Sequence, residues 1–272
     1  MNVDLLTSPW VTMWVVAFAI YVACKAISLR EINFGRIDTR MIGYLIAWPG
    51  MDARSFLDRG ENELIPTISF REWIGPLCKL ILGLCLLYMG AQNISAYSIL
   101  LAGWTGIVGF VLTLHFGIFG LLTLFWQRHG VNVAPIMNRP AIACSVGEFW
   151  GNRWNRAFRD LTHRFLFRPL RTKVGAIGAL LIGFVVSGVI HELAITVPAQ
   201  SGYGGPTIYF LIQSVAILIE RSRLGLRIGL RSQFRGWLYT CAALVGPIGL
   251  LIPNDFVTKV AIPFFQAIGA MP

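Results

Sequence analysis

The chain has 272 residues, of which 56% are hydrophobic and only 13% are charged, and its formal net charge is +10. A soluble domain of this length needs far less apolar side chain, so the composition excludes a soluble protein and predicts an integral membrane protein. The Lys and Arg residues lie between apolar runs and not along a soluble face. Membrane topology therefore explains the positive charge, and no nucleic-acid partner is expected.

Apolar runs long enough to cross a bilayer predict an all-α, polytopic transmembrane helix bundle. We expect about seven spans, at roughly 10–29, 73–90, 95–126, 174–197, 203–220, 236–252 and 256–271. The run 95–126 is too long for one straight crossing and is rich in glycine, so it is either tilted, broken or two helices, which would give eight or nine spans. The first run has no positive segment before it and is expected to remain as a membrane helix. We treat residues 1–272 as a single membrane-embedded domain.

The basic loops predict the orientation of these spans. Residues 152–173 and 221–235 are rich in Arg and poor in acids, which places both on the cytoplasmic side. The uncharged connection 198–206 then lies on the opposite side. Counting backwards puts the N-terminus outside, and seven spans put the C-terminus inside. The membrane is either a bacterial inner membrane or the endoplasmic reticulum.

Several shorter features complete the organisation. The apolar piece 41–51 is too short to cross and is stopped by Pro49-Gly50, so it is predicted to be interfacial or re-entrant. Residues 52–72 mix both charge signs and are expected to form a solvated loop. The five cysteines show no C-x-x-C spacing, which predicts small buried side chains and neither a metal site nor a disulfide framework.

A basic amphipathic stretch precedes the fourth expected span. On a helical wheel the apolar face holds Trp150, Trp154, Phe158, Leu161 and Phe165, and the opposite face holds Asn152, Arg156, Arg159 and His163. This pattern is typical of a helix in the membrane plane, which Pro169 should end. The arginines either follow membrane topology and meet anionic lipid, or also attract a polyanionic substrate such as an acyl-CoA. Asn155 is either a cap or a site residue.

An ionisable pair, His191-Glu192, lies inside an apolar run. Small residues recur before it at Gly175, Ala179, Gly183, Ser187 and Gly188, which predicts close helix packing with His191 toward the protein interior. A buried imidazole is expected to be neutral, the state that a general base needs. Ser187, one turn earlier, is better placed than Glu192 to orient the ring. The alternative is a structural histidine, and for His115, in a similar run, that interpretation is favoured.

The positions of His191 and Asn155 leave one question open. If the span starts near Val174, His191 lies about 25 Å along the helix from its cytoplasmic end. Asn155 lies near the cytoplasmic surface. They share a site if the helix is tilted, starts later or borders a hollowed cytoplasmic side, and otherwise they act at different places.

Three segments resemble the membrane-bound O-acyltransferase superfamily, in particular its wax-synthase-like branch. They are Phe149-Trp-Gly-Asn-Arg-Trp-Asn155, Ser187-Gly-Val-Ile-His191-Glu192 and Tyr44-Leu-Ile-Ala-Trp-Pro-Gly-Met51, and the resemblance runs from about 40 to 220. It implies a multi-helix bundle with an internal chamber, an acyl-CoA donor and an alcohol acceptor, with no cofactor beyond that co-substrate. It also implies that His191 is the catalytic base and Asn155 a second active-site residue.

The expected substrate-binding residues come from the same motifs. They are Trp150, Arg153, Trp154, Arg156, Arg159, Ser187 and Glu192. The sterol and diacylglycerol branches carry an acid and a second Trp where Asn152 and Arg153 stand, which favours a long-chain alcohol over those acceptors. Two alternatives remain open: a family member that acylates a metabolite, polymer or protein, and a small membrane transporter. The sequence assigns no oligomeric state.

Overall fold

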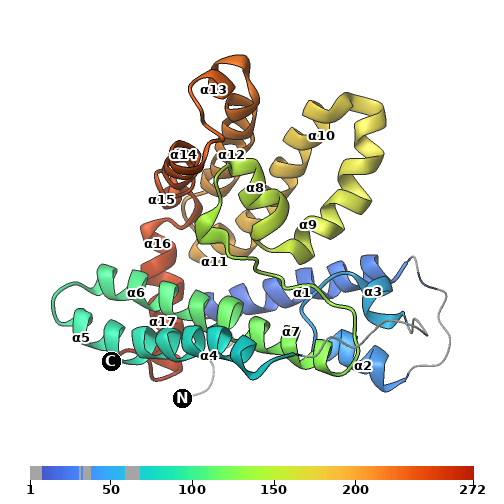
Figure 1. Cartoon of the computed structure of the whole chain (residues 1–272). Helices are drawn as coiled ribbons and strands as arrows, with labels where there is room; N and C mark the ends of the chain where they lie inside the picture. The colour runs from blue at the N-terminus through green and yellow to red at the C-terminus, as the bar shows by residue number, and fades with distance from the viewer. Residues whose placement is uncertain (1–7, 31, 33–37, 59–67) are drawn as a thin grey trace. The chain divides into compact units, whose positions relative to one another are not determined.

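The fold is all-helical, as predicted, in a computed structural model that describes residues 8–30, 32, 38–58 and 68–272 (Figure 1). Within these ranges no strand occurs. The chain packs as two compact units that interleave in sequence. The first unit takes residues up to Ile20, Arg139–Trp154 and Thr162–Pro272, and the second takes Tyr21–Asn138 and Asn155–Leu161.

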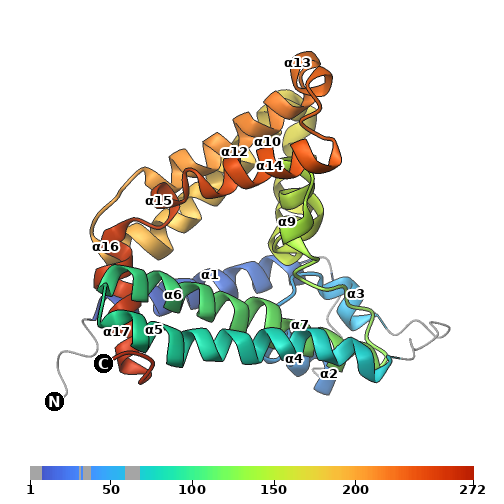
Figure 2. The same ribbon diagram turned by 60° about the vertical axis from the view of Figure 1, so that its left-hand side comes forward.

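The second unit is built on two long helical runs. Their helices and the shorter ones around them are α1 (Pro9–Leu29), whose second half belongs here, α2 (Thr39–Ile46), α3 (Ala53–Leu57), α4 (Phe70–Cys85), the π-helical turn Leu86–Gly90, α5 (Ala91–Ser95), α6 (Ile99–Val111), the π-helical turn Leu112–Ile118, α7 (Phe119–Arg128) and most of α9 (Arg156–Thr162). The runs 70–95 and 99–128 lie side by side and are joined by a short turn (Figure 2).

Glycines explain how closely these two runs pack. A Cβ on Gly109 would lie 2.7 Å from the backbone nitrogen of Leu87, and one on Gly117 would lie 2.8 Å from the Cα of Leu80. The glycines of 95–126 therefore serve close helix packing. They do not split the run, because Ile99–Arg128 is one continuous helical stretch of 30 residues.

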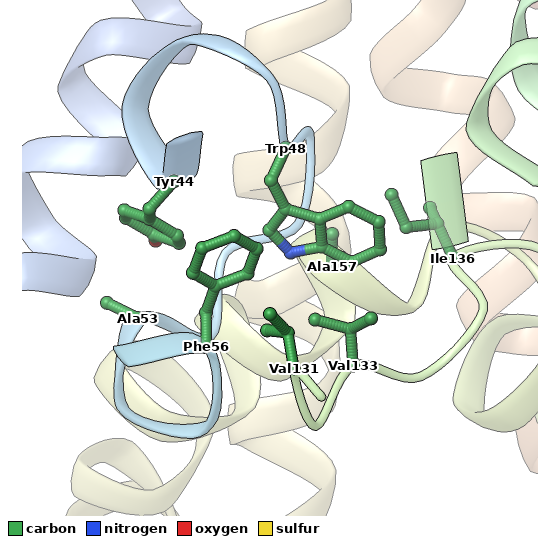
Figure 3. Packing of buried hydrophobic residues seen from close by; sticks show 8 residues of the cluster. All are labelled: Tyr44, Trp48, Ala53, Phe56, Val131, Val133, Ile136 and Ala157. Carbon is green, nitrogen blue, oxygen red and sulfur yellow. The ribbon is translucent and has the colours of Figure 1, made fainter. Parts of the chain in front are cut away.

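An aromatic core holds the short elements of the second unit together. Figure 3 shows Phe56 between Tyr44 and Trp48, with ring centroids 5.3 and 6.1 Å away, beside Val131, Val133 and Ile136. Ala157 of α9 belongs to the same buried cluster. Packing of this kind fixes the first turn of α9 against the loop 131–138.

The first unit carries the second basic loop and the histidine span. Its elements are the 3₁₀ turn Pro140–Ile142, α8 (Val146–Glu148), the π-helical turns Phe149–Arg153 and His163–Phe167, α10 (Arg168–His191), the π-helical turn Glu192–Thr196, α11 (Val197–Ala199), α12 (Gly205–Arg221), α13 (Arg223–Arg227), α14 (Gln233–Val245), α15 (Ile248–Leu251), α16 (Asn254–Phe256), the π-helical turn Val257–Ala261 and α17 (Ile262–Ala267). The helices α10 and α12 run side by side in both views (Figures 1 and 2).

Five helical runs in the described part of the chain are long and apolar enough to cross a membrane. They are Pro9–Leu29, Phe70–Ser95, Ile99–Arg128, Arg156–Ala199 and Gln233–Leu251, which match five of the seven expected spans. The expected span 203–220 forms α12, whose 17 residues reach about 25 Å and fall short of a hydrocarbon core of about 30 Å. The expected span 256–271 lies on a continuous helical run over 254–267, which is also shorter than the roughly 20 residues that a crossing needs. The count of seven is therefore not confirmed.

The basic amphipathic stretch is not one continuous helix. Asn155 has a left-handed backbone, with φ of 41°, and separates the π-helical turn that carries Trp150 from α9. The single helical face expected for Trp150 and Phe158 is therefore wrong. Pro169 does not end the helix either, because the widened π-helical turn just before it accommodates a residue that lacks an N–H.

The helix that begins at α9 is interrupted at Gly175. This residue has φ 73° and ψ 175°, a backbone conformation that is almost restricted to glycine, and the chain changes direction there. The membrane leg that ends at His191 therefore starts after Gly175. This start is nearly the one near Val174 that the sequence predicts, so His191 still lies about 24 Å along the helix from it. That His191 and Asn155 share a site stays a prediction.

Substitution of Gly175 by Ala is expected to lower the free energy of unfolding by about 1–3 kcal/mol, because a Cβ penalises this conformation. No neighbouring atom lies within 4 Å of the added methyl group, so only backbone strain is tested. Gly183→Ala is the matched control, since its Cβ also meets nothing but its backbone is helical, and it should be neutral or stabilising by up to about 1 kcal/mol. Thermal unfolding in detergent measures both. Equal midpoints for the two variants would contradict the strain at Gly175.

The shorter elements follow the sequence in part. The apolar piece 41–51 forms the short helix α2, which ends before Pro49-Gly50 as predicted. In the expected loop 52–72, Asp52 caps the short helix α3, and residues 59–67 lie outside the described residues. All five cysteines are free thiols, but the prediction that all are buried is wrong, because Cys78 and Cys85 on α4 are exposed.

An apolar groove of about 400 Å³ lies between α12 and α14. Its walls include Ile208, Leu211, Val215, Tyr239 and Ala242. None of the expected site residues lines it. The internal chamber that the family resemblance implies therefore stays a prediction.

Candidate active site

His191 is held in one tautomer by its own helix. Its Nδ1 lies 2.7 Å from the backbone carbonyl oxygen of Ser187, one turn earlier. A carbonyl oxygen can only accept, so Nδ1 carries the hydrogen and the neutral ring presents an unprotonated Nε2. The orienting atom is thus the backbone oxygen of residue 187, which any residue would supply, and a role for the Ser187 side chain stays a prediction.

An aromatic wall stands beside the histidine in the first unit. The His191 ring packs on Phe210 of α12 with centroids 4.6 Å apart, and Phe210 packs on Trp150 at 5.3 Å. The Trp150 indole N–H donates to Oε1 of Gln213 at 3.4 Å. His191 thus faces protein, as predicted, and two of the sequence motifs meet through one phenylalanine.

Glu192 points to the start of α12. Its Oε1 accepts from the N–H and the hydroxyl of Thr207 at 3.2 and 3.0 Å, and its Oε2 accepts from the Thr196 hydroxyl at 2.6 Å. A carboxylate at a helix N-terminus is favoured by the helix dipole. Next to it, Gly188 lets the two helices touch, since a Cβ there would lie 2.6 Å from the Cα of Thr207. Glu192 therefore fixes the separation between His191 and α12.

Arg153 is bound within the motif. Its Nε and Nη2 donate to Oε1 of Glu148 at 2.8 and 2.6 Å, and its Nη1 donates to the carbonyl of Arg139 at 3.2 Å. Burial opposes ionisation of Glu148, but the Cys144 N–H and the Arg153 guanidinium outweigh it and hold the pKa of Glu148 below its usual value. This ion pair braces the loop that carries Trp150.

A second buried carboxylate holds the same loop from α12. Glu220 is only 1% exposed, and it accepts from the N–H groups of Val146 and Gly147 at 2.7 and 3.0 Å. Together with Phe210 and Gln213, it gives α12 three contact points on the segment 146–150. The position of Trp150 is thus set by α12 and not by a continuous helix through the motif.

Asn155 lies in the second unit, where it caps α9. Its Oδ1 accepts from the N–H of Phe158 at 3.3 Å, and its own N–H contacts the sulfur of Met137 at 3.3 Å. The backbone of the next residue, Arg156, donates to the carbonyl of Ile136 at 3.0 Å. Because Oδ1 is the accepting atom, the side-chain NH₂ group is the end of the amide that remains as a donor.

The other expected substrate-binding residues are partly buried. Trp154 stacks on Phe149 with ring centroids 5.6 Å apart. Arg159 forms an ion pair with Asp160 at 2.6 Å. The Nε of Arg156 is buried and has no hydrogen-bond partner among the described residues. The same described residues contain no group of three or more His, Cys, Asp or Glu side chains arranged to hold a metal ion.

Comparison with protein families identifies the region that carries this geometry. Residues 133–212 match the model of the membrane bound O-acyl transferase family, and this range includes Trp150, Asn155, His191 and Phe210. Residues 133–212 belong to that family.

Curated proteins that resemble parts of this chain include long-chain-alcohol O-fatty-acyltransferases of plants. The long-chain-alcohol O-fatty-acyltransferase of Simmondsia chinensis is 28% identical over 138 residues, which are 46% of this chain and 39% of that protein. Probable long-chain-alcohol O-fatty-acyltransferases 1 and 3 of Arabidopsis thaliana are 35% identical over 72 residues and 31% identical over 100 residues, which are 24% and 34% of this chain and 21% and 29% of theirs. The matches thus cover less than half the length of these relatives. No solved structure matches the chain.

Outside the O-acyltransferase segment, one buried lysine organises the third sequence motif. Lys25 of α1 is 3% exposed, and its Nζ donates to the carbonyls of Tyr44, Trp48 and Gly50 at 2.7–2.8 Å. The ammonium also lies 3.5 Å from the centroid of the Tyr44 ring. All three N–H groups are used, so the lysine fixes the turn 48–50 at the end of α2.

Sequence reasoning missed several residues of this arrangement. Lys25, Gln213 and Glu220 are polar side chains in or beside apolar runs, and that setting alone marks a specific role. Phe210 gives no such signal, because one Phe in an apolar helix looks like any other.

Proposed function

We propose that this protein is an acyl-CoA-dependent O-acyltransferase that esterifies a hydroxyl acceptor, in the first place a long-chain alcohol, in a membrane. The observation that carries the proposal is the tautomer of His191, with Nδ1–H donated to a backbone carbonyl and Nε2 left as a base. The family match over 133–212 and the names of the relatives support the reaction class.

In this mechanism, Nε2 of His191 takes the hydroxyl proton while the alcohol oxygen attacks the thioester carbonyl of acyl-CoA. A carbon–oxygen bond forms and the carbon–sulfur bond breaks. The imidazolium then returns the proton to the CoA thiolate. No acyl-enzyme is required, because the thioester is already activated. Phe210 and Trp150 keep the ring in place and exclude water from one side of it.

Asn155 is proposed as a neutral donor to the thioester carbonyl or the acceptor hydroxyl, through its NH₂ group. Asn155→Asp tests this role, because Asp keeps the cap on α9 and tolerates a left-handed backbone but lacks the donor. We expect Asp to preserve the unfolding midpoint and to lower kcat about 10²-fold. Asn155→Ala should lower kcat and also destabilise by about 1–2 kcal/mol. Full turnover with Asp would leave Asn155 as a cap only.

Arg153, Arg156 and Arg159 are proposed to receive the phosphates of CoA from the cytosol. Arg156 is the strongest candidate within the motif, because its buried Nε lacks a partner among the described residues. Arg153 contributes less in this scheme, since Glu148 already binds its guanidinium. Binding of CoA to purified variants would separate the two, with a larger loss expected for Arg156→Gln.

The proposal is tested with purified protein in proteoliposomes. Release of free CoA thiol should depend on both a long-chain acyl-CoA and a long-chain alcohol. Release of CoA without the alcohol would indicate a thioesterase. Movement of either substrate across the bilayer without any CoA release would favour the transporter alternative. Short-chain or soluble acceptors, supplied in parallel, report whether another hydroxyl compound is preferred.

A further inference from the structure

The connection between α12 and α14 has a regular pattern that the proposed reaction does not use. Residues 222–232 read Ser-Arg-Leu-Gly-Leu-Arg-Ile-Gly-Leu-Arg-Ser, with Arg at every fourth position and an aliphatic residue at every second one. We call this segment the arginine turn. It contains no acid. It joins the apolar helix α12 to a candidate membrane span that starts at Gln233, so it lies at a membrane boundary.

The arginine turn exposes large apolar side chains together with its charges. Leu224, Leu226 and Ile228 are 67%, 53% and 46% exposed, and Arg223 and Arg227 are exposed beside them. A surface turn of a protein in water rarely exposes three large aliphatic side chains that lie so close together and next to arginines. Alternation of this kind suits the boundary between headgroups and acyl chains, where aliphatic groups enter the apolar layer and arginines meet phosphate.

The charges of the turn differ in their surroundings. Arg231 and the preceding Arg221 act electrostatically on the buried carboxylate of Glu220. Arg223 and Arg227 form no ion pair with any carboxylate of the described residues. They lie four residues apart on α13 and therefore share one face. Arg223 and Arg227 are therefore the arginines of the turn that can bind an external anion.

The turn is held in a fixed conformation by its own hydrogen bonds. The Ser222 hydroxyl accepts from the N–H of Gly225 at 3.0 Å, and the N–H of Leu230 donates to the carbonyl of Gly225 at 2.9 Å. Gly225 is buried against the end of α12. A Cβ at this position would lie 3.0 Å from the Cα of Glu220, so no larger residue fits. The exposed groups are thus presented by an ordered platform, which reduces the entropy lost on docking.

We propose that the arginine turn is a docking surface for anionic phospholipid, with Arg223 and Arg227 on the phosphate groups and Leu224, Leu226 and Ile228 in the upper acyl layer. Charge complementarity selects this occupant, because an acid-free, Arg-bearing surface at a bilayer boundary faces an anionic leaflet. The proposal is independent of the acyl-transfer chemistry.

The test places an environment-sensitive fluorescent amino acid at Leu224 in the full chain, reconstituted in nanodiscs. We expect a blue shift when phosphatidylglycerol is added to phosphatidylcholine, and reversal of the shift at high salt. Each arginine is worth about five-fold in lipid affinity. Arg223→Gln with Arg227→Gln should therefore lower the apparent affinity for phosphatidylglycerol, measured from the blue shift, by about 25-fold. Arg168→Gln with Arg171→Gln removes the same charge elsewhere in the first unit and should keep the shift.

Four results would overturn the proposal. The first is an identical spectrum in both lipid compositions. The second is a full shift in the Arg223/Arg227 double variant, and the third is an equal loss in the Arg168/Arg171 control. The fourth is the same shift on adding CoA to discs of phosphatidylcholine alone, which would make the turn a site for soluble phosphates. All variants are first checked by size-exclusion chromatography, which reveals a misfolded sample. If the Gln double variant is misfolded, Arg223→Lys with Arg227→Lys takes its place, and this variant should keep the shift because it keeps both charges.

Discussion

Substitution of His191 by Ala is expected to lower acyl-CoA-dependent ester formation by about 10²–10⁴-fold, the range that a lost general base accounts for. The alanine removes Nε2, the atom that takes the proton in this mechanism. Among the described side chains, His191 is the one whose ring nitrogen donates to the carbonyl of Ser187, so no other ring replaces it. Turnover is followed as ester formed per unit time from acyl-CoA and a long-chain alcohol. The unfolding midpoint, measured in the same detergent, shows whether the variant is folded.

Ser187→Ala is the matched control for this experiment. The ring is oriented by the backbone carbonyl of residue 187, which Ala retains. The variant should keep the orientation of the His191 ring and most of the activity, so that any loss measures the expected substrate-binding role of the Ser187 hydroxyl. A large loss in Ser187→Ala would assign the role to the hydroxyl. Retained turnover in His191→Ala would remove the histidine from the mechanism.

Lys25→Met is expected to destabilise the protein by about 4 kcal/mol, with a fall in the unfolding midpoint of roughly 10 °C. Lys25 donates three hydrogen bonds of 2.7–2.8 Å to carbonyls at the end of α2, and Met leaves these acceptors buried without that donor. The turn 48–50 and the aromatic core around Phe56 should loosen as a result (Figure 3). Thermal unfolding in detergent measures the effect.

Lys259→Met provides the comparison for Lys25. Lys259 is half exposed and pairs with Asp255 one turn earlier at 3.0 Å. Exposed pairs contribute about 0.5 kcal/mol or less, so its midpoint should hardly move. Equal midpoints for the two variants would contradict the structural role of the buried lysine.

The parts of the site that depend on local spacing could be predicted from the sequence. The turn geometry of a helix places the backbone carbonyl of residue 187 next to the ring of His191, whichever side chain that residue carries. The short helix before Pro49-Gly50 also follows from local rules, because Pro and Gly stop it. The helical class follows from composition alone, since apolar runs of this length form helices in a bilayer.

Other parts depend on contacts that a helical wheel does not contain. The wheel placed Trp150 and Phe158 on one helix, but the left-handed backbone at Asn155 divides them. Pro169 looked like the stop signal, whereas a π-helical turn absorbs it and the chain turns at Gly175. Arg153 looked available for an anionic substrate, and its partner Glu148 lies five residues before it on the same turn.

The most direct measurement of the central claim uses an alcohol labelled with heavy oxygen. Purified protein receives a long-chain acyl-CoA and the labelled alcohol, and mass spectrometry follows the ester while a thiol reagent follows CoA. Attack by the deprotonated hydroxyl predicts that every ester molecule retains the label and that one CoA thiol appears for each ester. Absence of labelled ester, or CoA released without it, would contradict the account.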